Sequence, residues 1–305
     1  MIQKSKRFSF SGHDSFQCRL LWLKKGYDFL AANRDFNESA AGIALGVGNN
    51  MVRSIRFWMR AFGITDEQDQ LTDFAHLMFG HGENEGLDPF LEDEATLWIL
   101  HYRLVAIGYA STYSLIFNEF RKSKIEFTKN DYLFFVRRKL EERSATISDN
   151  SINEDFVVFV KLYMSNEQKD IDESFSGILT ELALLDFFVK QKEDVKKESE
   201  NVYYIAPSER VEIPEIAVLY AIIENADYKD SISLNQLETD EDSPGSIFAM
   251  TKSGLYQKIR SITQQYPFVV LSEHAGIREL QFKNKPKSQE ILRQYYANQA
   301  KYEPV

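Results

Sequence analysis

The 305-residue sequence has little of what several common protein classes require. Cys18 is the only cysteine, so no disulfide can form within the chain, and a reducing, cytoplasmic location is expected. Only 7 prolines and 14 glycines are present, which argues against a disordered chain and against a loop-rich all-β fold. No long apolar run follows the basic N-terminus, so we expect neither a signal peptide nor a membrane-spanning helix.

Acidic residues outnumber basic residues overall, but basic residues predominate near the N-terminus. The formal net charge is −10, which by itself argues against a nucleic-acid-binding protein. Residues 1–62 nevertheless contain ten Lys and Arg against four Asp and Glu, whereas residues 63–100 contain ten acidic residues and no Lys or Arg. This asymmetry is typical of a nucleic-acid-binding surface at one end of a molecule; the alternative is chance clustering on solvated faces.

Hydrophobic periodicity predicts a mainly α-helical protein with small β-hairpins. Helical spacing is clear over 15–32, 38–45 and 49–62, and residues 70–74 resemble the entry to a wing strand. We therefore expect a winged helix-turn-helix in the first third of the chain.

The length of the chain favours two domains, because single hydrophobic cores rarely grow beyond about 250 residues. The polar run at 142–151 is the first plausible boundary. We expect a winged helix-turn-helix DNA-binding domain with a helical extension in 1–143 and a helical domain in 151–305.

The last third of the chain repeats the helix-and-hairpin pattern. A helix at 251–264 is followed by apolar strands at 268–271 and 277–282. This order predicts a second winged-helix-like module at the C-terminus. Its basic side chains would serve either a second DNA contact or a dimer interface, and the sequence does not separate these two roles. They are Lys252, Lys258, Arg260 and Arg278.

Residues 40–56 carry the sharpest motif of the sequence. A helix-turn-helix needs a small residue where its two helices cross, and Gly42 supplies one. It also needs a residue that tolerates positive φ in the turn, and Gly46 is placed there. Val52 and Ile55 lie one turn apart and would point into the core. These spacings together indicate a helix-turn-helix.

The opposite face of the second helix would carry Asn and Arg side chains. Both residue types make bidentate contacts with base edges in the major groove, and an arginine late in the helix would contact phosphate. The alternative is a helical hairpin inside a larger fold, with solvated arginines. A phosphate-binding glycine loop is excluded because no strand precedes the glycines and no Lys-Ser or Lys-Thr follows them. The predicted nucleic-acid-binding residues are Asn49, Asn50, Arg53, Arg56 and Arg60.

Two groups of polar residues are candidates for cutting DNA. His13 and Asp14 beside Arg19 could supply a general base, an orienting acid and a phosphate clamp, although helix capping explains the same spacing without any chemistry. The second group could offer oxygen ligands to Mg²⁺ or Mn²⁺, but its spacing matches no metal motif, and a solvated or docking surface is favoured. Its members are His76, His81, Glu83, Glu85, Asp88, Glu92, Asp93 and Glu94.

His101 is expected to be a satisfied core histidine, because it lies on an apolar helix face. Cys18, one turn from Trp22, is expected to be packed rather than reactive.

Five short motifs are spread along the chain: residues 10–16 (FSGHDSF), 22–26 (WLKKG), 87–93 (LDPFLED), 243–248 (SPGSIF) and 275–278 (AGIR). Together they resemble the DUF4007 family of bacterial proteins, a domain of unknown function. The resemblance covers nearly the whole chain and implies a place beside PAPS-reductase-like, cysteine-desulfurase and ATPase proteins in DNA phosphorothioation systems that act in antiphage defence. The nicking subunit of the single-stranded form of that modification is similar.

Three hypotheses remain open from the sequence. The first is a DNA-binding component that brings phosphorothioation enzymes to duplex DNA. The second is a DNA nickase that uses Mg²⁺ or Mn²⁺ and allows sulfur insertion. The third is a winged-helix transcriptional regulator without catalytic activity, which implies a palindromic operator and a symmetric homodimer. None of the three has a membrane partner.

Overall fold

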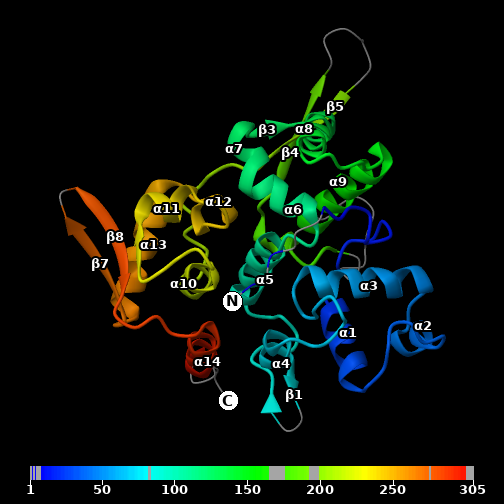
Figure 1. Ribbon diagram of the computed structural model, residues 1–305, viewed down its shortest axis with the longest axis horizontal. Helices are drawn as coiled ribbons and strands as arrows, with labels where there is room; N and C mark the ends of the chain where they lie inside the picture. Colours follow the sequence, from blue (N-terminus) through cyan, green and yellow to red (C-terminus); the bar gives the residue numbers. More distant parts are fainter. Residues whose placement is uncertain are drawn as a thin grey trace.

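The protein is mainly helical, as the sequence predicts, and the expected hairpins belong to two small three-stranded antiparallel sheets (Figure 1). The N-terminal helices lie on one flank and the C-terminal hairpin on the opposite flank. The computed structural model describes residues 2, 4, 8–81, 84–164, 176–191, 199–274 and 276–299.

The N-terminal part is a cluster of short helices around buried aromatic side chains. Trp58 and Met59 are fully buried at the centre of this cluster. Its elements are α1 (Trp22–Ala31), α2 (Ala41–Leu45), α3 (Asn49–Ala61), α4 (Asp73–Phe79), β1 (Gly80–His81) and β2 (Asn84–Glu85).

The central part is built on α5, which is buried on almost every side because its sequence is apolar all round. Asp93 caps its N-terminus by accepting a hydrogen bond from the backbone of Ala95. The other central elements form a helical layer and the sheet β3-β5-β4. In chain order they are α5 (Glu94–Ile107), α6 (Ser111–Leu115), η1 (Ile116–Phe120), α7 (Arg121–Ser123), β3 (Glu126–Phe127), α8 (Lys129–Glu142), α9 (Asp149–Tyr163), η3 (Thr180–Leu182), β4 (Asp186–Gln191) and β5 (Ser199–Tyr204).

The C-terminal part surrounds a second buried helix, α10, and carries the sheet β6-β8-β7. Ser233 and Gln236 form a reciprocal capping box at the start of α11. The predicted helix and hairpin of this part are confirmed. Its elements are α10 (Glu215–Glu224), β6 (Ser231–Ser233), α11 (Leu234–Thr239), α12 (Pro244–Ile247), α13 (Lys252–Gln265), β7 (Val269–His274), β8 (Ile277–Phe282) and α14 (Ser288–Gln299).

Buried polar side chains cross the boundary predicted near 142–151. The guanidinium of Arg103 on α5 donates to the carbonyls of Phe62 and Gly63, at 3.0 and 2.9 Å, and to the Tyr220 hydroxyl on α10, at 2.8 Å. Arg103 also lies 3.7 Å from the ring centroid of Phe74. The end of α3 and the centre of α10 are therefore held by one side chain. Within the described residues, no helix has the length and apolarity needed to cross a bilayer.

His101 lies in the core, as expected from its apolar helix face. Its Nε2 donates to the carbonyl of Ile247 at 3.0 Å, which leaves Nδ1 to accept from the Tyr163 hydroxyl at 2.7 Å. Burial lowers the pKa of His101 to about 3. The folded protein therefore keeps this imidazole neutral at pH values where the unfolded chain protonates it.

We predict that this histidine makes the protein acid-sensitive. Because the folded pKa lies below the unfolded value of about 6.5, its contribution to stability is complete above pH 6.5. That contribution falls by about 1.4 kcal/mol per pH unit as the pH drops from 6.5 toward 3. Urea unfolding of the wild type and of His101→Gln between pH 7 and pH 4 measures the difference in slope. Parallel pH profiles of the two proteins would contradict the prediction.

Candidate nucleic-acid interface

The α2–turn–α3 segment has the local geometry that the sequence predicts. Gly46 adopts φ +67° and ends α2, a conformation that residues with a Cβ rarely adopt. A Cβ on Gly42 would lie 2.8 Å from the carbonyl oxygen of Val47, so the chain can approach this closely only at glycine. Val52 and Ile55 are buried, with 6% and 0% of their surface exposed. Packing thus fixes which face of α3 points into the core, and the opposite face is left pointing to solvent.

The wing strand expected at 70–74 is reduced to a single antiparallel bridge between Thr65 and Leu71. Thr72 ends this stretch, because its hydroxyl accepts from the backbone of Ala75 and starts α4. The same hydroxyl donates to the carbonyl of Gly63 at 2.8 Å. The short hairpin β1–β2 follows α4 rather than α3.

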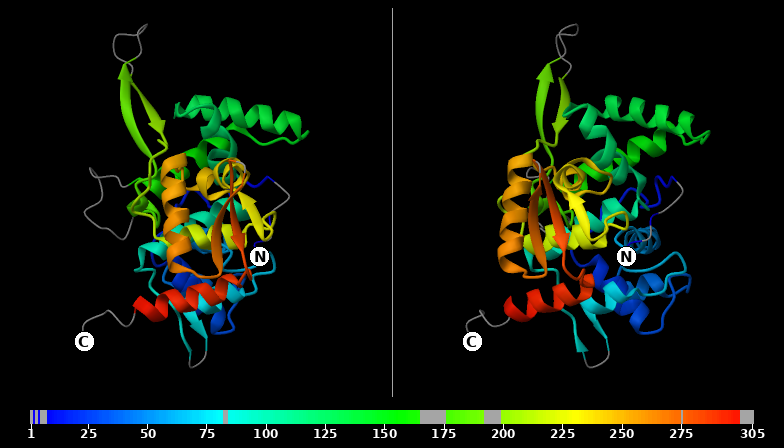
Figure 2. Two further views of the ribbon diagram at one scale, coloured as in Figure 1. Left: turned by 90° about the vertical axis from the view of Figure 1, so that its left-hand side faces the viewer. Right: turned by 60° about the vertical axis from the view of Figure 1, so that its left-hand side comes forward.

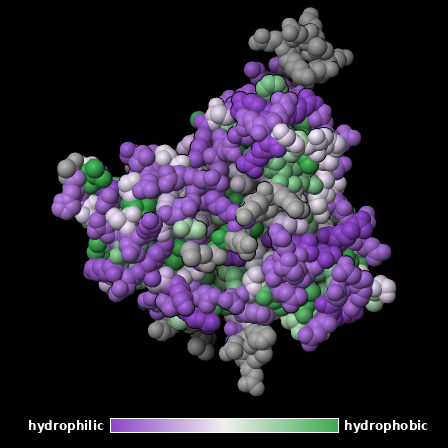
Figure 3. Space-filling model, in the orientation of Figure 1, coloured by the Kyte–Doolittle hydropathy of each residue, from purple (hydrophilic) through white to green (hydrophobic). Residues whose placement is uncertain are grey.

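Three of the five predicted DNA-binding side chains are exposed on the first turns of α3. Asn49, Asn50 and Arg53 all face solvent, and the Arg53 side chain is 61% exposed. The guanidinium of Arg53 donates to the Asp14 carboxylate at 2.7 Å and to the Asn50 side-chain oxygen at 2.9 Å. Hydrophilic residues cover most of this flank, at the lower right of Figure 3.

The other two predicted side chains are engaged within the protein. Arg56 and Arg60 both donate to the Asp69 carboxylate, at 2.8 and 2.9 Å through their Nε atoms. Arg56 also reaches the side chain of Asn37 at 3.0 Å. Burial acts to lower the pKa of Arg60, but a hydrogen bond to Tyr109 and the charge of Asp69 together raise it. These arginines fasten the loop after α3 to the helix, a role the sequence did not indicate.

His13 is almost completely buried and has a partner far away in the sequence. Its Nδ1 accepts from the backbone of Ser15 at 3.2 Å, so Nε2 carries the proton and donates to Asp155 at 2.9 Å. Asp155 also accepts from the backbone of Ser11 at 2.5 Å and from the Thr112 hydroxyl at 3.0 Å. Nε2 therefore ties the N-terminal segment to α9, and Nδ1 fixes the local turn at Ser15, which together favour a structural role.

The three residues predicted to cut DNA have different neighbours. His13 pairs with Asp155, and Asp14 pairs with Arg53. The Arg19 guanidinium lies 5.3 Å from the ring centroid of Trp22. The structure thus joins Asp14 to the predicted DNA-binding helix, whereas His13 faces inward.

The acidic segment after α4 is used mainly for local structure. Asp88 accepts from the backbones of Glu92 and Asp93, at 2.9 and 3.0 Å, and from the Thr96 hydroxyl at 2.5 Å. His76, the histidine of this group that lies within α4, also has a partner inside the protein, because its Nδ1 lies 3.0 Å from the Tyr27 hydroxyl.

The side chains of His81 and Glu83 lie outside the described residues. Among the residues that are described, no group of three or more His, Cys, Asp or Glu could hold a metal ion. The described residues therefore do not by themselves form a divalent-cation site.

We predict that His13 and Asp155 act on stability as one unit. Asp155→Ala should cost about 3–5 kcal/mol, because it leaves buried donors without an acceptor. His13→Ala should also destabilise the protein, and the double variant should lose less than the sum of the two. Urea unfolding measures all three, with exposed Glu154→Ala on the same helix as the control. Additive losses, or a neutral His13→Ala, would show that the pair is not coupled.

The protein is mainly helical and exposes a polar helix end after a tight glycine turn. The chain belongs to the DUF4007 family, described as proteins of unknown function, whose profile matches residues 10–296. The predicted family is therefore confirmed.

Two solved structures are similar to the chain. One is a crystal structure of SspB, with 25% identity and a TM-score of 0.81, covering 98% of this chain and 90% of that one. The other is a magnesium ion-bound crystal structure of SspB, with 24% identity, a TM-score of 0.80 and the same coverage. A search of curated protein sequences finds no match. The likeness extends over nearly the full length of both chains.

Proposed function

We propose that this protein binds duplex DNA through the first two turns of α3. The observation that carries the proposal is the joint exposure of Asn49, Asn50 and Arg53 at the start of a helix whose other face is fully packed. In helix-turn-helix proteins, residues at the N-terminal end of the second helix contact base edges in the major groove. Asn suits adenine and Arg suits guanine in such contacts.

The ion pair between Arg53 and Asp14 does not prevent this role. Both partners are partly exposed, at 61% and 29%, and surface pairs of this kind contribute only about 0–1 kcal/mol. A phosphate or a guanine edge can therefore replace the Asp14 carboxylate. Arg56 and Arg60 share the single carboxylate of Asp69, so this cluster keeps a net positive charge next to the proposed contact.

The wider context of the proposal comes from the family resemblance. We interpret the N-terminal helices as a helix-turn-helix with a vestigial wing and the C-terminal helix and hairpin as a winged-helix-like module. The DUF4007 motifs support a role as the DNA-binding component of a bacterial DNA phosphorothioation and antiphage defence system. Its partners there would be PAPS-reductase-like and ATPase proteins.

We predict that Asn50→Ala combined with Arg53→Ala weakens duplex binding at least roughly tenfold. Each good bidentate base contact is worth about 1–3 kcal/mol, and both side chains would lose theirs. Fluorescence anisotropy of a labelled duplex at fixed salt measures the dissociation constant. The control is Arg138→Ala, which removes an exposed arginine from α8. Equal affinity of the double variant and the wild type at low salt would overturn the proposal.

DNA nicking is a second candidate function. It is favoured by one observation, the magnesium bound to the similar SspB structure, because divalent cations assist many phosphodiester cleavages. Asp14 and Arg19 remain the proposed polar residues for it, with His13 supporting them from the interior.

A plasmid assay separates the two candidates. Nicking predicts that supercoiled plasmid becomes open circle with Mg²⁺ or Mn²⁺ and stays supercoiled with chelator. Binding alone predicts a supercoiled plasmid under both conditions. Asp14→Asn, which also removes the partner of Arg53, should abolish nicking without weakening DNA binding. Nicking that persists in Asp14→Asn would remove Asp14 from the proposed machinery.

A further inference from the structure

The C-terminal part orders its elements as the helix α10, the strand β6, the three helices α11, α12 and α13, the hairpin β7–β8 and the helix α14. The strands lie in the order β6-β8-β7, all antiparallel, so that the short strand before α11 pairs with the second strand of the hairpin. Helix α13 packs between α10 and β7 and lies beside the hairpin in both views of Figure 2. In this arrangement, α13 and the hairpin β7–β8 belong to the same packed unit.

Helix α13 divides into a buried face and a polar face. Leu255, Ile259 and Ile262 are buried, with 0–2% of their surface exposed. The exposed face carries cations and amides but no acidic residue: Lys252, Ser253, Gln257, Arg260, Gln264 and Gln265. Cations and amides are the side chains that contact phosphates and base edges.

The absence of acidic residues extends well beyond this helix. Residues 243–272 contain no Asp or Glu, although 46 of the 305 residues are acidic and the net charge is −10. Lys258 is the one cation of α13 that is buried; its Nζ donates to the carbonyl of Val211 at 2.9 Å and lies 3.4 Å from Glu215. It is therefore a structural residue and not a DNA contact. Lys252 and Arg260 face solvent, and the Lys252 Nζ also lies 3.8 Å from the carboxylate of Glu238 on α11.

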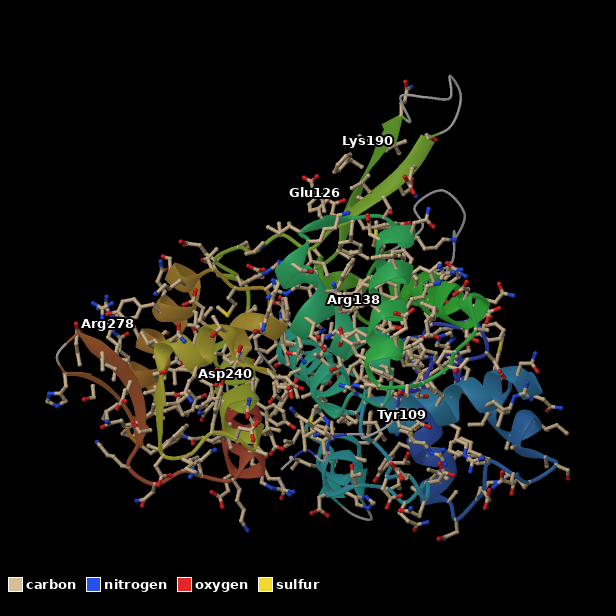
Figure 4. The ribbon with its side chains drawn as sticks, turned by 45° about the horizontal axis from the view of Figure 1, so that its top comes forward. Tyr109, Glu126, Arg138, Lys190, Asp240 and Arg278 are labelled. Carbon is tan, nitrogen blue, oxygen red and sulfur yellow. The ribbon has the colours of Figure 1, made fainter. Side chains whose placement is uncertain are left out.

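The start of β8 adds a third exposed cation. The guanidinium of Arg278 lies 4.9 Å from the ring centroid of Tyr256 on α13, which ties the hairpin to the helix. Its Nε donates to Glu273 at 3.0 Å, and the side chain remains 45% exposed. Arg278 lies at the outer edge of the molecule in Figure 4, on the far side from Tyr109 and the blue N-terminal helices.

We propose that the exposed face of α13 and the start of β8 form a second surface for duplex DNA. Lys252, Arg260 and Arg278 contact phosphates, and the glutamines of α13 face the groove. The surface lies on the opposite flank from α3 (Figure 1), so one molecule holds two segments of duplex. A dimer interface is the alternative occupant, but the core of such an interface is depleted of charge and rich in apolar side chains, unlike this face of α13. The α13 surface itself does not rest on the α3 contact, whereas the claim that one molecule holds two segments of duplex rests on the proposed function.

Binding as a function of salt tests the surface with a charge-matched control. The test variant is Lys252→Ala, Arg260→Ala and Arg278→Ala together. The control removes three exposed cations elsewhere, by Lys129→Ala, Arg138→Ala and Lys190→Ala. We expect the test variant to reduce the slope of log affinity against log salt by about 2–3 and the control to leave it unchanged, because each lost phosphate contact lowers the slope by about 0.9. Equal slopes for the test variant, the control and the wild type would overturn the proposal.

A bridging assay separates this surface from α3. An immobilised duplex should capture the wild-type protein, which should then retain a second, labelled duplex. The test variant should still be captured through α3 but should lose the second duplex. Asn50→Ala with Arg53→Ala should instead be captured through α13 and also fail to bridge. Light scattering gives the mass of each protein; a wild-type dimer that becomes monomeric in the test variant would assign the surface to self-association and overturn the proposal.

Discussion

The guanidinium of Arg103 is the interaction on which the arrangement of the molecule depends. It neutralises the carbonyl-rich end of α3 by donating to Phe62 and Gly63, and it reaches α10 through the Tyr220 hydroxyl. Helix C-termini attract cations, and a buried charge of this kind is tolerated only when its donors are satisfied. The same side chain also lies over the ring of Phe74 at the start of α4. The N-terminal and C-terminal parts are therefore fixed relative to each other, which places the two proposed DNA surfaces on opposite flanks.

The division of α3 into two halves follows from this anchoring. The C-terminal half is held by Arg103 at its end and by Asp69 along its side, where one carboxylate serves Arg56 and Arg60. In the N-terminal half, Arg53 pairs with Asp14 but its side chain stays 61% exposed, and Asn49 and Asn50 face solvent. A helix whose C-terminal half is held rigidly and whose polar N-terminal end is exposed suits groove recognition, because side chains on a fixed helix lose little further conformational freedom on binding.

Local features of the fold were predictable from the sequence, and long-range polar contacts were not. Gly42, Gly46 and the apolar spacing of α3 are local signals, so the turn and α3 are where the sequence predicts. The two preceding helices start later than predicted, α1 at Trp22 rather than 15 and α2 at Ala41 rather than 38. The wing at 70–74 was wrong in detail, since Thr72 caps a new helix; Thr72 followed by the apolar Phe74 and Leu77 was a signal for this. The pairing of His13 with Asp155 spans 142 residues and leaves no periodic trace. Likewise, Arg56 and Arg60 look solvated until the path of the loop carrying Asp69 is known.

The most direct test of the central claim is photocrosslinking from the start of α3. Cys18 is the only cysteine and is fully buried, so Asn49→Cys introduces a thiol that can be labelled selectively with a photoreactive group. Phe134→Cys places the same label on α8, at a side chain that is 72% exposed. If α3 lies in the groove, irradiation with duplex DNA gives a covalent adduct from position 49 and little from position 134. Equal yields at the two positions, or an adduct only from position 134, would contradict the account.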